Sequence, residues 1–340
     1  VPIHGWALEA RVYAEDPLRN FLPSIGTLTT YKEPRGVQGT VRIDSGVREG
    51  DEISIFYDPM ISKLITHGKD RKEAIELMGR ALDSYVIRGL NHNVCFLRAV
   101  MEHPRFMSGN ISTKFIPDEF PEGFKGLHPT KEQQTEILAG TAVMHFKRLV
   151  RDNTIEGQIH AREVNSFSGV ATISGVEGTH EVSVQAAPEG ENKFLVTIDG
   201  KTTTVDTDWQ IDSFVMSANI DSRPSDIQYV DRIYQGYKIQ YHGTYFDVTL
   251  QTPKDQQYAK HMLPPHKIDL TRSVISPMPG RVFSVSVQPG DSVTLGQELI
   301  IIEAMKMQNI IRAQRDGKIA KVLVKQGQDV TLDHLLIEFV

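Results

Sequence analysis

Cysteine is nearly absent from this sequence. Cys95 is the only cysteine among 340 residues, so no disulfide can form within the chain, and a reducing compartment is favoured. No stretch approaches the ~20 consecutive apolar residues of a membrane-spanning helix. Basic residues are not concentrated either, since 37 Lys and Arg stand against 43 Asp and Glu without a basic block. We therefore expect no disulfide scaffold, no membrane association and no binding of nucleic acid.

The chain also lacks an initiating methionine, an Arg-rich leader and a signal-peptide core, as a processed or truncated product would. It is too long for one compact core, because single cores stop growing near ~250–300 residues. Its 40% hydrophobic and 24% charged residues are ordinary for globular proteins. We expect two or three folded domains.

The region 1–120 is predicted to be α+β. Apolar residues alternate from Trp6 to Val12, as in a strand, and recur at helical spacing over 70–82 and 92–101. Cys95 would lie in the core. The histidines of this region are expected at the surface or in helix caps rather than as ligands: His4, His67, His92 and His103.

The region 121–251 is predicted to begin with one long helix, 131–151, which a capping box starting at Thr130 would initiate. Short strands follow. Asp199-Gly200 and the pair at 242–243 are typical of hairpin turns. A long helix followed by antiparallel strands predicts a helix packed with a curled sheet or barrel.

The remaining sequence divides into a linker and a repeat. Residues 252–272 are polar, contain Pro264-Pro265 and lack periodicity, so we expect a linker. Within 273–340, apolar and glycine positions recur at an offset of 37 residues. The matching pairs include Gly280/Gly317, Val282/Ile319, Gly290/Gly327, Val293/Val330, Leu295/Leu332 and Leu299/Leu336. Two such copies predict a small quasi-symmetric β sandwich or flattened barrel.

Lys306 lies at the link between the two halves of this repeat. A lysine at a hairpin tip is either an ordinary solvated side chain or one displayed for covalent modification. Met305 and Met307 flank it where solvation alone would favour polar residues, and methionine surfaces suit recognition by another protein. This pattern favours the displayed lysine.

Two segments here resemble a known family. Ala304-Met305-Lys306-Met307, with Ser276-Pro277-Met278-Pro279-Gly280 upstream, resembles the biotinyl domain of biotin-dependent carboxylases. The resemblance implies that a biotin protein ligase attaches biotin to Lys306, and that Ala304, Met305 and Met307 form the recognition motif. The related lipoyl domains usually carry Asp-Lys-Ala at this hairpin, which makes a lipoyl carrier the remote alternative.

The N-terminal region supports the same family. Gly5 to Pro17, Phe21 to Ser24 and Tyr57 to Leu64 resemble the biotin carboxylase C-terminal subdomain. The whole layout resembles the α subunits of acyl-CoA carboxylases, the propionyl-CoA branch in particular. The implied fold is multidomain α+β. Its parts are a biotin carboxylase C-terminal subdomain (1–120), a helix plus β-barrel domain contacting the carboxyltransferase β subunit (121–251), a linker (252–272) and a biotinyl, or biotin carboxyl carrier, domain (273–340).

This resemblance implies a ligase that forms C–C bonds. ATP and bicarbonate would drive carboxylation of the biotin on Lys306, and the β subunit would pass the carboxyl group to propionyl-CoA, forming methylmalonyl-CoA. The ATP-grasp portion, which would bind ATP and Mg²⁺ or Mn²⁺, is expected before Val1, and we expect no metal site in this segment. Two alternatives stay open: another acyl-CoA carboxylase, such as the methylcrotonyl enzyme, and a pure biotin carrier and scaffold. The expected compartment is the mitochondrial matrix, or else a bacterial cytoplasm.

The resemblance also assigns roles to single residues. Arg11 would stabilise negative charge on the ureido oxygen of biotin; from the sequence alone, it would simply pair with Glu9 or Glu15. Phe21 would contact the biotin ring, or else be a half-buried core residue. Arg42 and Asp58 match positions at the dimer face of stand-alone biotin carboxylases and are expected to be structural.

Overall fold

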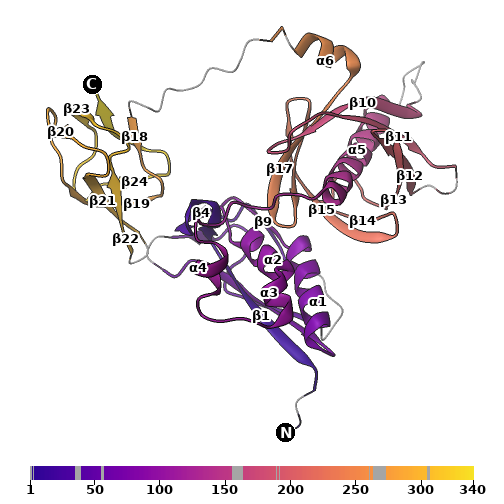
Figure 1. Cartoon of the computed structure of the whole chain (residues 1–340), viewed down its shortest axis with the longest axis horizontal. Coiled ribbons are helices and arrows are strands. Elements are labelled where there is room, and N and C mark those ends of the chain that lie inside the picture. The colour runs from indigo at the N-terminus through magenta and orange to yellow at the C-terminus, as the bar shows by residue number, and fades with distance from the viewer. Residues whose placement is uncertain are drawn as a thin grey trace.

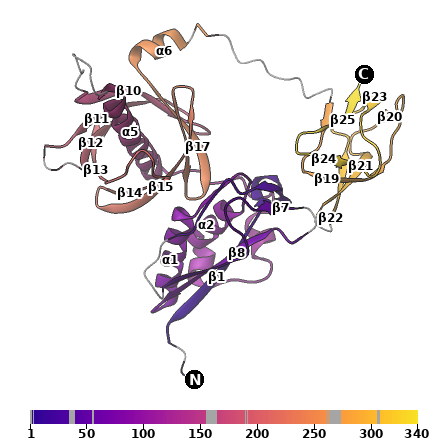
Figure 2. The ribbon, with the colours of Figure 1, turned by 180° about the vertical axis from the view of Figure 1, so that it is seen from behind.

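The computed structural model describes residues 2, 4–34, 40–54, 57–154, 164–188, 190, 192–259, 261–262, 273–304 and 307–340. Figure 1 shows three bodies that follow one another along the chain, and Figure 2 shows them from behind. Strands outnumber helices among the described residues, which agrees with the predicted multidomain α+β class. No helix in these described ranges is long and apolar enough to cross a membrane.

The first body is built on an antiparallel sheet in the order β1-β8-β6. Helices α1 and α2 pack on one face of this sheet and share its hydrophobic core, which includes Val12, Leu64, Met78 and Leu82. Its elements are β1 (Trp6–Tyr13), β2 (Glu15–Asp16), η1 (Pro17–Arg19), β3 (Leu22–Pro23), β4 (Gly26–Thr27), β5 (Thr30–Lys32), β6 (Val41–Ser45), β7 (Glu52–Ile53), β8 (Met60–Gly68), α1 (Arg71–Ser84), β9 (Val86–Arg88), α2 (Val94–Glu102), α3 (Pro104–Ser108) and α4 (Phe115–Glu119). The opposite face of the sheet carries Arg11, Lys63 and Asp44.

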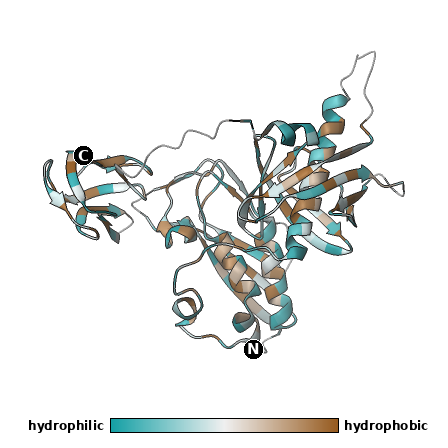
Figure 3. Cartoon of the chain, turned by 45° about the horizontal axis from the view of Figure 1, so that its top comes forward, coloured by the Kyte–Doolittle hydropathy of each residue, from teal (hydrophilic) through white to brown (hydrophobic). Residues whose placement is uncertain are grey.

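The second body is a closed antiparallel barrel that contains a helix. Helix α5 contacts all eight barrel strands, and its Leu138, Ala142 and Phe146 belong to the same core as the inward-facing strand residues. Figure 3 shows hydrophobic and hydrophilic residues alternating along these strands, as expected where one face is buried. The elements are α5 (Lys131–Asn153), β10 (Ser166–Ile173), β11 (His180–Ala186), β12 (Lys193–Ile198), β13 (Lys201–Asp206), β14 (Val215–Ile220), β15 (Arg223–Ile233), β16 (Gly236–Tyr241) and β17 (Thr244–Gln251).

The local signals in this region are confirmed. Thr130 and Gln133 form the predicted capping box, and Asp199 and Gly200 both have positive φ, as the predicted turn requires. Helix α5 extends to Asn153, two residues beyond the predicted end. The predicted linker, 252–272, contains a short helix, α6 (Pro253–Ala259), in whose first turn Thr252 and Asp255 hydrogen-bond each other.

The third body confirms the internal repeat. Strands begin at the predicted offset of 37 residues: β19 at Gly280 and β23 at Gly317, β20 at Ser292 and β24 at Asp329, β21 at Glu298 and β25 at Leu335. The two sheets are β18-β25-β23-β20 and β22-β21-β19-β24, so each half lends its short strand to the other half's sheet. The elements are β18 (Ser273–Ile275), β19 (Gly280–Val285), β20 (Ser292–Val293), β21 (Glu298–Ala304), β22 (Met307–Arg312), β23 (Gly317–Val322), β24 (Asp329–Val330) and β25 (Leu335–Phe339).

A buried polar interface joins the first body to the barrel. The Nε atom of Arg98 donates to both carboxylate oxygens of Asp83 at 2.9 Å, and Nη1 of Arg98 lies 2.8 Å from Glu102. From the barrel, His242 reaches Glu102 at 3.3 Å. A Cβ at the neighbouring Gly243 (φ +74°) would lie 2.6 Å from Cα of Cys95, so the β16–β17 turn can pack against α2 only with glycine at this position.

Two glutamines extend this interface. Nε2 of Gln228 donates to the backbone oxygens of Asp83 and Tyr85 at 2.8 and 3.0 Å. Arg88 donates to the side-chain oxygens of Gln228 and Gln240 at 2.8 and 2.9 Å. The barrel and the first body are thus hydrogen-bonded through groups that are buried or partly buried, and we expect them to unfold together.

His92 is buried beside this interface, contrary to the expectation of a surface position. It is 5% exposed, its ring centroid lies 6.5 Å from that of Tyr245, and neither ring nitrogen has a hydrogen-bond partner among the described residues. Burial, and then the charge of Arg88, lower the pKa of His92 to about 4. His103 does cap a helix as expected, because its Nδ1 accepts from the backbone N–H of Arg105.

We predict that replacing His92 by leucine makes the fold less sensitive to acid. The imidazole of His92 takes up a proton near pH 6.5 in the unfolded chain, but only near pH 4 in the folded protein. The contribution of His92 to the free energy of unfolding is therefore complete above pH 6.5 and is lost as the pH falls to 4. At about 1.4 kcal/mol per pKa unit, wild type should lose about 3 kcal/mol more than the variant over this range. Urea unfolding at pH 7.5, 6 and 4.5 measures this difference, and His92→Gln, which is polar but does not ionise, should behave as His92→Leu does. Equal acid sensitivity in wild type and both variants would contradict the prediction.

Candidate functional site

The β21–β22 hairpin carries the sequence-predicted attachment site. Its pairing runs from Glu298–Arg312 up to Ala304–Met307, so the two strands are paired up to the last positions before the turn. Met305 and Lys306, which connect them, lie outside the described residues, as does the side chain of Met307. Ala304 is buried, and its neighbour Glu303 is exposed. A hairpin that is paired up to Ala304 and Met307 can display one long modified side chain at its turn, so the described residues fit covalently attached biotin.

The segment from Ser276 to Gly280 packs beside this hairpin. Met278 is buried, and Nδ2 of Asn309 on β22 lies 3.4 Å from its sulfur. The hydroxyl of Ser276 donates to the backbone oxygen of Met278. A Cβ at Gly280 would lie 2.7 Å from the backbone oxygen of Glu303, so only glycine lets β19 approach β21 this closely. The two segments that suggested the biotinyl domain therefore form one structural unit.

Arg11 lies on β1, on the sheet face opposite the helices. Its side chain is 59% exposed, and its Nε donates to Glu9 at 3.1 Å, so the ion pair expected from the sequence forms with Glu9. Hydrogen bonds to Glu9 and Tyr13 raise the pKa of Arg11 further. An exposed, permanently charged guanidinium with free N–H groups can stabilise developing negative charge on a ligand oxygen.

Phe21 lies in the turn between η1 and β3. It has a positive φ of 59° and packs edge-on against Phe96, with ring centroids 4.9 Å apart. It lies at the margin of an aromatic cluster that includes Phe120 and Phe124. This placement agrees with the half-buried core residue that the sequence also allowed.

Among the described residues, a hydrogen bond links the first and third bodies. Nη1 of Arg19, two residues before Phe21, lies 3.5 Å from the backbone oxygen of Pro277 in the segment beside the hairpin. Arg11 and Phe21 belong to the first body, whereas Ala304 and Met307 belong to the third. The candidate residues therefore fall in two places, and this hydrogen bond joins the bodies that contain them.

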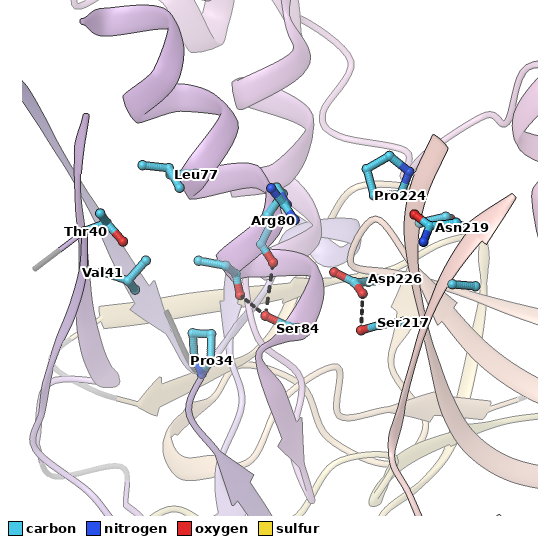
Figure 4. A pocket seen from close by; sticks show the side chains of 13 residues that line it. Pro34, Thr40, Val41, Leu77, Arg80, Ser84, Ser217, Asn219, Pro224 and Asp226 are labelled. Atoms are coloured by element: carbon cyan, nitrogen blue, oxygen red, sulfur yellow. Dashed lines mark hydrogen bonds between the residues drawn. The ribbon is translucent and has the colours of Figure 1, made fainter. Parts of the chain in front are cut away.

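A separate groove of about 430 Å³ lies between α1 and the barrel strands β14 and β15. Figure 4 shows Arg80 and Ser84 from α1 on one side of this groove and Ser217 and Asp226 from the barrel on the other. The hydroxyl of Ser217 donates to Asp226 at 2.6 Å. None of the candidate residues lines this groove. Over the described part of the chain, no cluster of three His, Cys, Asp or Glu side chains could hold a metal ion.

Sequence reasoning missed the polar interface between the first body and the barrel. Asp83, Arg98, Gln228 and His242 come from segments up to about 160 positions apart along the chain. Apart from His242, which lies in a predicted turn, none of them belongs to a local motif that the sequence analysis used. The only local signal was the turn at 242–243, which indicated a hairpin but not the surface against which it packs.

Three family models match consecutive parts of the chain. The descriptions are "Biotin carboxylase C-terminal domain" for residues 9–118, "Propionyl-coenzyme A carboxylase BT domain" for 137–267 and "Biotin-requiring enzyme" for 272–339. The chain belongs to the biotin-dependent carboxylase family.

Individual relatives are similar to this chain along nearly all of its length. The chain is 42% identical over 324 residues to the mitochondrial propionyl-CoA carboxylase alpha chain of Caenorhabditis elegans. The alignment covers 92% of this chain and 45% of that protein. It is 37% identical over 362 residues to the propionyl-CoA carboxylase alpha chain of Ruegeria pomeroyi, covering 100% and 52%. To the mitochondrial methylcrotonoyl-CoA carboxylase subunit alpha of Dictyostelium discoideum, it is 31% identical over 344 residues, covering 93% and 46%. The chain spans about half the length of these relatives.

Proposed function

We propose that this chain is part of the α subunit of a propionyl-CoA carboxylase and carries biotin on Lys306. The observation that carries the proposal is the β21–β22 hairpin, paired up to Ala304 and Met307 and supported by the segment at 276–280. The match of the biotin-requiring family model to 272–339 supports it. Biotin supplies a ureido nitrogen that accepts the carboxyl group, and its amide link to Lys306 would place it at the end of a long neutral arm.

We propose that the three bodies divide the work. Residues 1–120 would complete the biotin carboxylase site, 121–251 would bind the carboxyltransferase β subunit, and 252–272 would tether the biotinyl domain at 273–340. A tether makes the second encounter intramolecular, at an effective concentration on the order of millimolar. The similarity to the propionyl-CoA carboxylase BT domain supports the second role. Biotin protein ligase, ATP with Mg²⁺ or Mn²⁺, bicarbonate and propionyl-CoA are the other proposed partners and substrates.

The proposal also specifies an acyl acceptor and a cellular compartment. The higher identity to propionyl-CoA carboxylase alpha chains than to the methylcrotonoyl relative supports propionyl-CoA. We propose the mitochondrial matrix as the compartment, because several relatives are named as mitochondrial. A bacterial cytoplasm is the alternative, because another relative comes from a bacterium. Assay of the α–β complex with both acyl-CoA substrates tests the acceptor.

We propose Arg11 as the residue that stabilises negative charge on the ureido oxygen, and Phe21 as a contact of the biotin ring. A positioned donor of this kind contributes on the order of 100–1,000-fold to the rate. The exposed guanidinium of Arg11 supports its role, since its N–H groups are accessible to a ligand. The ring of Phe21 packs against Phe96 and is half-buried, so part of this residue is accessible for such a contact.

Arg11→Ala in the full-length subunit should reduce carboxylation of biotin at least 100-fold, because the ureido oxygen loses its cationic partner. Avidin capture of the same variant should remain normal, because Arg11 lies outside the biotinyl domain. Arg42→Ala removes the same charge from the same sheet face, where Arg42 pairs with Asp44 at 3.1 Å, and should retain most activity. Equal activities of the two variants would reject the proposed role of Arg11.

A further inference from the structure

The two sheets of the third body have the same strand register, so their outer faces can be compared residue by residue. In the sheet β22-β21-β19-β24, Ser284 on β19 lies directly opposite Ile301 on β21. In the sheet β18-β25-β23-β20, the pair 37 residues further along the chain is Lys321 and Glu338. A register shift precedes both pairs at the same position. Each residue on one outer face therefore has a structural equivalent on the other.

The sheet that carries the hairpin is apolar where the other sheet is polar. Ile301 alternates with the buried Ile300 and Ile302, so it lies on the outer face, and Ile310 on β22 lies directly opposite it. Ile310 is 38% exposed, and Phe283, directly before the Ser284–Ile301 pair, is 44% exposed. We call the surface formed by Phe283, Ile301 and Ile310 the hairpin face. The equivalent residues of the other sheet are Ala320, Glu338 and Ser273.

The other sheet shows that this scaffold does not need apolar residues at these positions. Nζ of Lys321 lies 3.5 Å from the carboxylate of Glu338, so an ion pair occupies the place of Ser284 and Ile301. The two sheets share their register and one hydrophobic core, and both outer faces meet the same structural demands. Apolar side chains that are grouped on an exposed face without a structural requirement are typical of an interaction surface.

The hairpin face is continuous with the turn that contains Lys306. The neighbouring outward row, two residues closer to the turn, is formed by Glu303 and Gln308. Two residues along a strand span about 7 Å, and the Ala304–Met307 pair that precedes the turn follows directly. A protein that encloses the turn from this side therefore contacts the hairpin face as well.

The length of the lysine side chain favours one partner. Unmodified Lys306 offers its amine on a four-carbon stem, so an enzyme that acylates this amine must bring its own active site close to the turn. After modification, the side chain is longer by the whole biotin molecule, and a protein that uses the ureido ring needs less contact with the module itself. The modifying enzyme is therefore the partner that comes nearest to the hairpin face.

We propose that the hairpin face is the surface on which a biotin protein ligase docks in order to modify Lys306. This inference rests on the proposed function, in which Lys306 carries biotin. Phe283, Ile301 and Ile310 would be buried against apolar side chains of the ligase. Three side chains make a small contact, which suits an enzyme that must release its product after one acylation.

The test transfers the polar outer face onto the hairpin sheet of the full 340-residue chain. One variant combines Phe283→Ala, Ser284→Lys, Ile301→Glu and Ile310→Ser, which are the residues that the other sheet has at these positions. With a biotin protein ligase, biotin and ATP, its kcat/KM for biotinylation should fall at least tenfold, through KM rather than kcat, because docking is weakened and the reacting amine is unchanged. Avidin capture over time gives the rate, and intact mass counts the biotin added.

Two controls separate docking from folding. Lys321→Ser combined with Glu338→Ile makes the opposite change on the other sheet, and Leu295→Ser removes an exposed apolar side chain near Gly296, to which Arg312 at the far end of β22 donates. Both should be biotinylated at the wild-type rate. Phe283→Ala alone, which shortens one exposed side chain, should still raise KM about threefold. Melting temperatures within a few degrees of wild type would show that each variant is folded.

The outcomes distinguish this inference from the proposed function. Equal kcat/KM in wild type and the four-residue variant would overturn the docking surface, as would an equal loss in the controls. Biotinylation at the wild-type rate with reduced carboxyl transfer in the α–β complex would assign the hairpin face to the β subunit and would also overturn it. A wild-type chain that takes up no biotin at Lys306 would instead reject the proposed function.

Discussion

Replacing Lys306 by arginine will abolish capture of the chain by avidin after co-expression with a biotin protein ligase. The ligase forms an amide between the carboxyl group of biotin and Nζ of the lysine; arginine keeps the positive charge but offers no amine that can be acylated. Intact mass will show one added biotin in wild type and none in Lys306→Arg. Nothing else in the hairpin has to change, since both side chains are long and cationic.

Lys318→Arg is the matched control, because Lys318 is an exposed lysine on β23 of the same body. It should be captured as wild type is. Capture of Lys306→Arg at the wild-type level would place the modified residue elsewhere, and a mass corresponding to lipoate would replace the proposed carrier by its relative. An unmodified amine in protein from its native host would remove the basis of the proposed function.

Replacing Arg98 by methionine will destabilise the first body and the barrel together by about 3–5 kcal/mol. Arg98 and Asp83 are 11% and 9% exposed, and methionine leaves the carboxylate of Asp83 buried without its main partner. Burial already raises the pKa of Asp83, and the charge of Arg98 opposes that effect. Removal of Arg98 should therefore raise that pKa further, and the loss of stability should be smaller at low pH.

Urea unfolding followed by circular dichroism and by fluorescence of the buried Trp209 measures this effect, since coincident transitions would show that both bodies unfold together. Arg223→Met is the control. Arg223 pairs with Glu132 at 2.7 Å, but both side chains are more than 60% exposed, and exposed pairs contribute at most about 1 kcal/mol. A loss of less than 1 kcal/mol in Arg98→Met would show that the polar interface adds little to stability.

Glu102 adds a pH dependence to the same interface. Its burial alone would raise the pKa, but the hydrogen bond from His242 and the charge of Arg98 outweigh burial and hold the pKa of Glu102 at about 2. A carboxylate whose folded pKa is lowered stabilises the fold above its unfolded pKa of about 4.3 and loses that contribution as the pH falls toward 2. The Glu102 contribution therefore disappears at lower pH than that of His92.

Much of the fold could be predicted from local sequence signals. The capping box at Thr130, the turn at Asp199-Gly200 and the 37-residue repeat depend on residues close together or on a fixed spacing, and each appears in the structure. The proposed biotinylation motif is local as well, since its four residues, Ala304 to Met307, are contiguous in the sequence. Helix α6 was missed because its seven residues are too few to show an apolar periodicity.

The sequence by itself determined which parts this chain has: an α+β body, a helix with antiparallel strands and a duplicated β module with Lys306 at the link between its two halves. Only the tertiary structure decided that α5 fills the barrel and that His242 and Arg98 meet at the interface between the barrel and the first body. The physical reason is the distance along the sequence over which each kind of interaction acts. Capping, turns and periodicity act within a few residues, whereas burial and charge pairing depend on which distant segments exclude water from one another.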